Sequence, residues 1–116
     1  MSWWVEIKSY RLSISGARDN APAWTRFVSL YDSEDTLRGY IQFRYDVPTL
    51  PGAYEYDVGT TGKKAVSFFM YEHSYSDVVD LLRNERPIYL SYYSSHSVFV
   101  GTSQYEPVGE GSEPSP

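Results

Sequence analysis

The sequence has no cysteine, only two histidines and no long uninterrupted apolar segment. Without cysteine the chain forms no disulfide, thiolate metal site, iron–sulfur cluster or cysteine nucleophile. No apolar run reaches the roughly 20 residues that a transmembrane helix needs, so we expect no membrane contact. The N-terminal residues MSWWVEIKSYRL lack a basic segment followed by an unbroken apolar stretch. We therefore predict a cytoplasmic protein rather than a secreted one.

Positive charge is also scarce. The 116 residues include 10 Lys and Arg against 15 Asp and Glu, which gives a net charge of -5. Residues 1–64 hold eight of each sign, whereas residues 65–116 hold two basic and seven acidic residues. Duplex DNA is bound through a broad basic surface, so this balance disfavours a nucleic-acid partner. An acidic flank of this kind can steer a basic protein partner.

Aromatic residues are abundant instead, with 12 Tyr, 5 Phe and 3 Trp. Many of them lie in segments where apolar and polar residues alternate, which is typical of strands with one buried face. In WWVEIKSYRLSISG, residues 3–16, the apolar phase switches at Lys8–Ser9. One extra residue at that point predicts a β-bulge within a single long, coiled strand.

Two hairpins are predicted after this strand. The first joins AWTRFVSLY to TLRGYIQFRYD through the polar residues 32–35, and the second joins AYEYDV to KKAVSFFMYE through GTTG, residues 59–62. The spacing in GTTGKK does not match a phosphate-binding loop, so we interpret it as a turn. The register of the first hairpin stays open. A four-residue loop groups Val28 with Ile41, which we favour, whereas a five-residue loop groups Phe27 with Ile41.

The remaining segments predict one helix, a last hairpin and a tail. SYSDVVDLLRNER predicts a helix near 75–86, capped by Ser74 or Ser76 and ended by Pro87. IYLSYY and SVFVGT predict two strands around a turn that contains His96. Residues 106–116 are rich in Gly, Pro, Ser and Glu, and we predict a disordered acidic tail after a single β-rich domain of residues 1–105.

These elements predict an α+β protein that is mainly antiparallel β, with about 6–7 strands. We expect a curled sheet or a small open barrel, with the helix plugging one end or lying on one face. We predict no catalytic residue, no metal site and no cofactor. One alternative is a small enzyme or ligand-binding barrel that uses Glu72, His73 and His96, if the loops that carry them meet.

The leading hypothesis is a non-catalytic binding module whose partner is a protein. Tyr and Phe rings beside Arg side chains on one sheet face can pack against a protein, and they can also stack on single-stranded bases, which is the second alternative. The sequence also allows a homodimer through an unpaired edge strand. The predicted aromatic–arginine surface consists of Phe27, Tyr31, Arg38, Tyr40, Arg44, Tyr89 and Tyr93.

Overall fold

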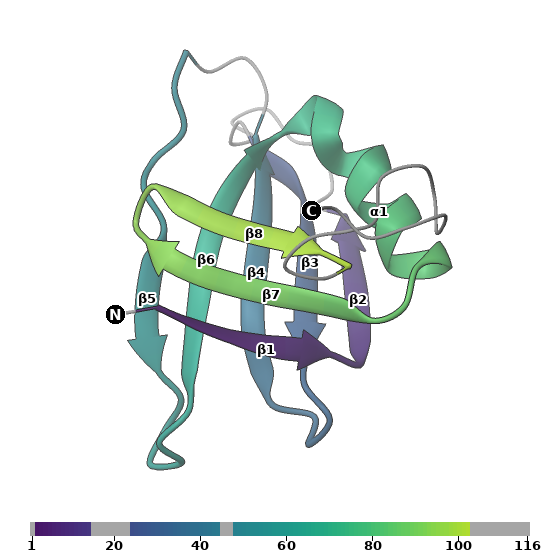
Figure 1. Ribbon diagram of the computed structural model, residues 1–116. Coiled ribbons are helices and arrows are strands. Elements are labelled where there is room, and N and C mark those ends of the chain that lie inside the picture. Colours follow the sequence, from purple (N-terminus) through teal and green to yellow (C-terminus); the bar gives the residue numbers. More distant parts are fainter. Residues whose placement is uncertain (1, 15–23, 45–47, 103–116) are drawn as a thin grey trace, which may run out of the picture.

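The computed structural model describes residues 2–14, 24–44 and 48–102. Eight strands, a 3-10 turn and one α-helix make up an α+β fold that is mostly β (Figure 1). In chain order they are β1 Trp3–Ile7, β2 Ser9–Ile14, β3 Trp24–Tyr31, β4 Leu37–Arg44, β5 Tyr54–Asp57, β6 Lys64–Tyr71, η1 Glu72–Ser74, α1 Tyr75–Asn84, β7 Ile88–Ser94 and β8 Ser97–Gly101. The predicted tail, residues 106–116, lies outside the described residues.

The strands form two sheets that face each other. One has three strands in the order β1-β7-β8, and the other has five in the order β2-β3-β4-β6-β5. Figure 1 shows the three-stranded sheet lying across the five-stranded one, and side chains from both contribute to one core. The predicted curled sheet or open barrel is therefore wrong, since neither sheet closes or curls among the described residues. Two sheets packed face to face bury the same apolar phases without closure.

The phase switch at Lys8 is where the chain passes from one sheet to the other. β1 pairs with β7, whereas β2 pairs with β3. Strands that change sheets in this way form the corners of a sandwich, and the change of phase keeps apolar side chains inside on both sides. The predicted position of the irregularity is confirmed, but the single long strand is wrong. Its division into two accounts for eight strands rather than 6–7.

The β3–β4 hairpin has the register of the five-residue loop only next to its turn, and beyond a shift it has the face grouping of the four-residue loop. Next to the loop Tyr31 lies opposite Leu37, as a five-residue loop requires, but further along Val28 lies opposite Ile41. The ladder shifts between these positions, with Arg38 as the extra residue. A bulge of this kind restores the phase of the following strand. Val28 and Ile41 are consequently both fully buried, as the favoured grouping predicted.

The five-stranded sheet is mixed rather than purely antiparallel. β6 forms an antiparallel hairpin with β5, and its other edge pairs in parallel with β4. The GTTG segment is a turn between β5 and β6, as predicted, and both Gly59 and Gly62 have positive φ. Hydrophobic alternation indicates which face of a strand is buried but not which strand lies beside it, so the parallel pair left no local signal.

The helix packs against the open side of the two sheets, next to the core (Figure 1). Its residues Val78 and Leu82 are buried, and the ring of Tyr75 meets Phe43 edge-on at 5.1 Å. Ser74 occupies the N-cap position but makes no capping hydrogen bond with its side chain. The preceding 3-10 turn holds Ser74 in a helical conformation, whereas a capping side chain needs an extended one. Because its buried residues face the core between the sheets, the helix covers neither sheet's outer face.

The two sheets approach each other closely at Gly39. A Cβ built there would lie 2.8 Å from a methyl carbon of Leu90 and 3.1 Å from one of Leu30, and both leucines are fully buried. Trp3 ties the sheets together at a second place, since its indole Nε1 donates a hydrogen bond of 2.7 Å to Glu55.

Within the described ranges no helix is long and apolar enough to cross a membrane.

Candidate interaction surface

The three-stranded sheet separates its side chains cleanly between an inner and an outer face. Ile7, Ile88 and Leu90 point into the core and are buried. Successive residues of a strand alternate between faces, so their neighbours point outward. Trp4 lies opposite Ser91, and Ser91 lies opposite Phe99, which forms a row across all three strands.

Four aromatic rings surround Ser91 on this outer side. Tyr89 and Tyr93 lie two residues before and after it in β7, and Trp4 and Phe99 flank it on β1 and β8. We call this surface the aromatic face. It consists of Trp4, Tyr89, Ser91, Tyr93 and Phe99.

Three of the four aromatic residues of the aromatic face are more than half exposed, and Tyr89 is half-buried. Trp4 is 59% exposed, Tyr93 51% and Phe99 58%. They meet in edge-to-face pairs, Trp4 with Tyr89 at 5.3 Å and Tyr93 with Phe99 at 5.7 Å. In an edge-to-face pair the positive edge of one ring meets the negative face of the other, but much of the surface of both rings stays in water. An aromatic side chain covers roughly 150–250 Å², so these three present on the order of 300–400 Å² to solvent.

The sheet that carries the aromatic face is almost free of charge. Its three strands contain no Lys or Arg, and their single charged residue is Glu6. Surfaces that hold single-stranded nucleic acid combine stacked aromatics with a basic groove. The aromatic face has the first component without the second, whereas an uncharged aromatic centre is typical of protein interfaces.

The predicted aromatic–arginine surface is divided between the two sheets. Tyr89 and Tyr93 belong to the aromatic face on β7, whereas the other five residues lie on β3 and β4 of the five-stranded sheet. The expectation that all seven share one face is therefore wrong. It assumed a single sheet, and the passage of the chain between two sheets removes that assumption. Whether any of them binds a partner stays a prediction.

On the five-stranded sheet, the structure brings Phe27 and Tyr40 together. Their rings stack nearly parallel at 5.7 Å, and burial raises the pKa of the Tyr40 hydroxyl. The ring of Tyr31 instead lies 5.7 Å from the guanidinium of Arg11 on β2. Arg44 lies at the end of β4, opposite Tyr71 of β6. The rings of Phe27, Tyr31 and Tyr40 are each half-buried.

Arg38 points away from Phe27 and Tyr40 because it is the extra residue of the bulge. Its guanidinium lies 5.3 Å from the ring of Trp3, on the other sheet. Its Nε donates to the carbonyl oxygen of Lys64 at 2.6 Å, and its terminal nitrogen contacts Asp32 at 3.1 Å. Bulges often redirect a side chain in this way. Arg38 thus belongs to a polar cluster at the end of the sandwich.

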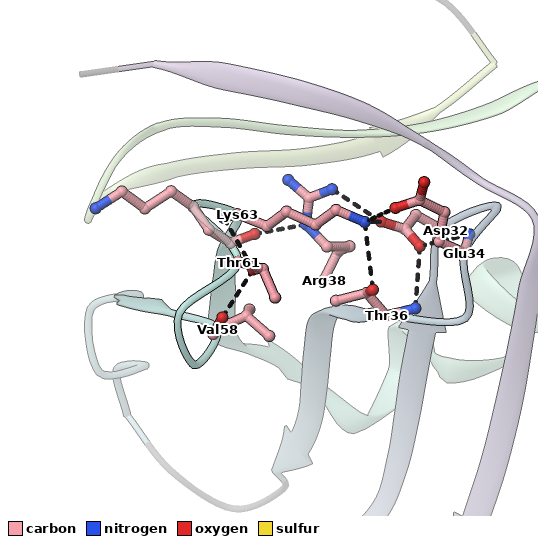
Figure 2. Close-up of polar contacts among 8 residues, drawn as sticks. Asp32, Glu34, Thr36, Arg38, Val58, Thr61 and Lys63 are labelled. Carbon is pink, nitrogen blue, oxygen red and sulfur yellow. Dashed lines mark hydrogen bonds and ion pairs between the residues drawn. The ribbon is translucent and has the colours of Figure 1, made fainter.

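This polar cluster joins the β3–β4 loop to the β5–β6 turn (Figure 2). Asp32 is only 5% exposed. One carboxylate oxygen accepts hydrogen bonds from the backbone of Glu34 and Thr36, and the other contacts Arg38 and Lys63. Lys63 also pairs with Glu34. No buried side-chain polar atom of this cluster lacks a partner, so the cluster ties the two loops together.

The electrostatics of Asp32 follow from those contacts. Burial alone would raise its pKa, but the backbone hydrogen bonds from Thr36 and Glu34 and the cations Arg38 and Lys63 lower the pKa to about 2. The pKa of Lys63 is raised, first by its hydrogen bond to Glu34. Both groups are therefore charged throughout the physiological pH range, which suits a structural ion pair better than a proton donor or acceptor.

Of the residues of the enzyme alternative, Glu72 and His73 are neighbours in η1. Glu72 pairs with Arg26 at 3.0 Å, and the ring of His73 stacks on Tyr71 at 5.7 Å. His96 sits in the β7–β8 turn, where its Nδ1 lies 3.1 Å from the Ser95 hydroxyl. Across the described part of the chain, no group of three His, Cys, Asp or Glu is placed to hold a metal ion. An enzymatic role for these residues stays a prediction.

Two members of the aromatic face, Trp4 and Phe99, were absent from the predicted surface. A signal for both exists in the sequence, since each has the phase opposite to the buried residues of its own strand. Trp4 follows Trp3 directly, and two adjacent tryptophans cannot both face the core of a regular strand.

No protein-family model matches this chain, and the searches of curated proteins and of solved structures returned no match.

Proposed function

We propose that this protein is a non-catalytic binding module that contacts a partner protein through the aromatic face. One observation carries the proposal. Among the described residues, three of the five exposed large hydrophobic side chains, Trp4, Tyr93 and Phe99, gather on one sheet surface whose strands hold a single charged residue, Glu6. The largest exposed apolar patch on a monomeric protein typically measures about 300–600 Å² and is often functional, and the aromatic face falls in this range.

The chemistry of the surface supports a protein partner. Aromatic residues supply most of the energetic centres of protein interfaces, because they bury large area at a small cost in conformational entropy. The aromatic face is smaller than the roughly 800 Å² per partner of a stable, standard-sized interface. We therefore expect a transient complex with affinity in the micromolar range. The absence of Lys and Arg from β1, β7 and β8 favours protein over nucleic acid.

A comparison of matched variants tests the proposal. The double variant Trp4→Ser/Phe99→Ser removes two exposed rings of the aromatic face without touching the core. Tyr54→Ser is the control, because Tyr54 is also an exposed aromatic residue, 67% exposed, on an edge strand of the other sheet. Immobilised wild type and both variants are exposed to extract from the source cells, and each captured protein is then purified and its affinity measured.

The proposal requires a partner that binds the wild type and Tyr54→Ser equally. Its affinity for Trp4→Ser/Phe99→Ser should fall by about tenfold or more. A partner that loses affinity only for Tyr54→Ser, or that binds all three proteins alike, would place the contact elsewhere. Turnover of a metabolite by the purified chain, undiminished in the double variant, would contradict a non-catalytic role.

A further inference from the structure

One edge of the three-stranded sheet, formed by β8, adjoins the aromatic face. β8 pairs with β7 on one side, and no other described strand pairs with its second side. In an antiparallel ladder every second residue of an edge strand directs its N–H and C=O groups outward. The sequence of β8, SVFVG, contains no charge and no proline that would block pairing.

A groove of about 320 Å³ lies at the beginning of this strand, where Ser97 and Val98 line it. Val98 of β8 lines one wall, residues 50–53 line another, and Phe68 and Met70 of β6 lie at its base. The backbone N–H of Ala53 donates to the carbonyl oxygen of Ser95, which anchors the second wall to the β7–β8 turn. Its lining is mixed, because the polar residues Ser95, His96 and Ser97 line it together with the apolar side chains.

The edge, the groove and the aromatic face are arranged as a strand-binding site. A segment that paired with β8 would turn alternate side chains to opposite sides of the sheet. One set would enter the groove beside Val98 and Met70. The other set would lie beside Phe99 on the aromatic face. Strand addition of this kind gains affinity from main-chain hydrogen bonds and specificity from alternate side chains.

We propose, on the basis of the function proposed above, that the partner contributes an extended segment that adds to β8. In this segment apolar residues on one phase alternate with lysine or arginine on the other. The apolar phase fits the groove. The basic phase fits the exposed rings, because aromatic faces attract cations, and it fits the protein's net charge of -5.

The size of the surface favours a short segment over a second copy of the chain. The exposed rings present on the order of 300–400 Å², which is about half of what each partner contributes to a standard-sized stable interface. In a β8–β8 pair of two copies, Val98 and Val100 of each would remain packed in their own core, where they already lie against buried residues. The groove would then receive no side chain.

Synthetic peptides test the inference with the full chain. The probe is a nine-residue peptide in which valine alternates with lysine. One control has the same composition with the valines contiguous, and another has glutamate in place of lysine. Binding is followed by NMR, together with hydrogen exchange of the amides of Val98–Gly101. We expect the probe to bind at least about tenfold more tightly than either control and to slow exchange in β8.

Two variants locate the site. Phe99→Lys adds a positive charge on β8 beside the bound segment, and Tyr54→Lys adds the same charge on the edge strand β5 of the other sheet. Both positions are exposed, so both variants should retain the wild-type melting temperature within a few degrees. Phe99→Lys should weaken binding of the probe by about tenfold, and Tyr54→Lys should leave it within about twofold.

Several results would overturn the inference. These are no binding of the probe at millimolar concentration, equal affinity for the probe and its controls, or equal weakening by both variants. Slow exchange of the outward amides of β8 in the free protein would also overturn it, because the edge would then be covered by another part of the chain or by a second copy. If a captured partner depends on Trp4 and Phe99 while the peptides fail, strand addition is wrong and the proposed binding function stands.

Discussion

On the outer side of the five-stranded sheet, Phe27 and Tyr40 stack with their rings nearly parallel, 5.7 Å apart, and both are half-buried. On the outer side of the three-stranded sheet, Trp4 and Phe99 meet their neighbours edge-on and remain more than half exposed. The first pair covers its own apolar surface. The second leaves that surface in contact with solvent, which is why we propose the three-stranded sheet as the binding surface.

The loops of the five-stranded sheet and the β8 edge of the three-stranded sheet also differ in whether their polar groups have partners. The loops of the five-stranded sheet are tied together by Asp32, Arg38 and Lys63, whose polar groups satisfy one another. The β8 edge of the three-stranded sheet has no such closure among the described residues. Aromatic content alone therefore does not mark a binding surface. What distinguishes the two regions is whether neighbouring side chains already satisfy the exposed groups.

The largest expected effect is on the core that joins the sheets. Leu90→Ala removes a fully buried side chain that packs against Gly39 of the opposite sheet. We expect the free energy of unfolding to fall by about 3–4 kcal/mol, because a cavity remains between the sheets. Ser91→Ala, the next residue of β7, faces outward and should cost less than about 0.5 kcal/mol. Urea denaturation measures both changes, and equal losses would contradict the assignment of inner and outer faces.

A smaller effect is expected from Asp32→Asn, which removes the central charge of the polar cluster. We expect a loss of about 2 kcal/mol at pH 7, because Arg38 and Lys63 then lose their anion. In contrast, Asp57→Asn breaks an exposed pair with Lys64 and should cost less than about 0.5 kcal/mol.

The effect of Asp32→Asn should depend on pH. The folded pKa of about 2 lies below the ordinary value of 3.8, so the carboxylate stabilises the fold above about pH 4. This contribution to stability is lost as the pH falls from about 4 through the folded pKa of about 2. Wild type and Asp32→Asn should therefore converge in stability near pH 2, as measured by thermal unfolding at a series of pH values. A difference that persists unchanged at pH 2 would exclude the ion pairs as its cause.

The smallest effects compare the two outer faces directly. Phe27→Ala should cost about 1–2 kcal/mol, because it removes a half-buried ring stacked on Tyr40. Phe99→Ala should cost less than about 1 kcal/mol, since that ring is already largely in water. Chemical denaturation of the two variants gives the comparison. A larger loss for Phe99→Ala would mean that the aromatic face contributes to folding rather than to recognition.

Local patterns in the sequence predicted much of the fold. Alternation separated the buried from the outward residues of β7, and the change of phase at Lys8–Ser9 marked a true irregularity. The helix was predicted to start and end within two residues of its observed ends. These features depend on a few neighbouring residues, whose preferences act within one element.

The features that were missed depend on contacts between distant residues. A change of phase looks the same whether a strand bulges or passes to another sheet, so the two-sheet arrangement was not predicted. The parallel pairing of β4 with β6 likewise has no local signature. Arg38 was placed on the wrong side because one bulge residue reverses the phase. The predicted surface consequently combined residues of two separate faces.

Hydroxyl-radical footprinting of the aromatic face tests the central claim most directly. In the free protein Trp4, Tyr93 and Phe99 should be oxidised readily, whereas the buried Tyr92 should not. In complex with the captured partner these three residues should become protected, and the exposed Tyr54 on the other sheet should keep its rate of oxidation. Rates at Trp4 and Phe99 that stay unchanged in the complex, while Tyr54 becomes protected, would contradict a binding role for the aromatic face.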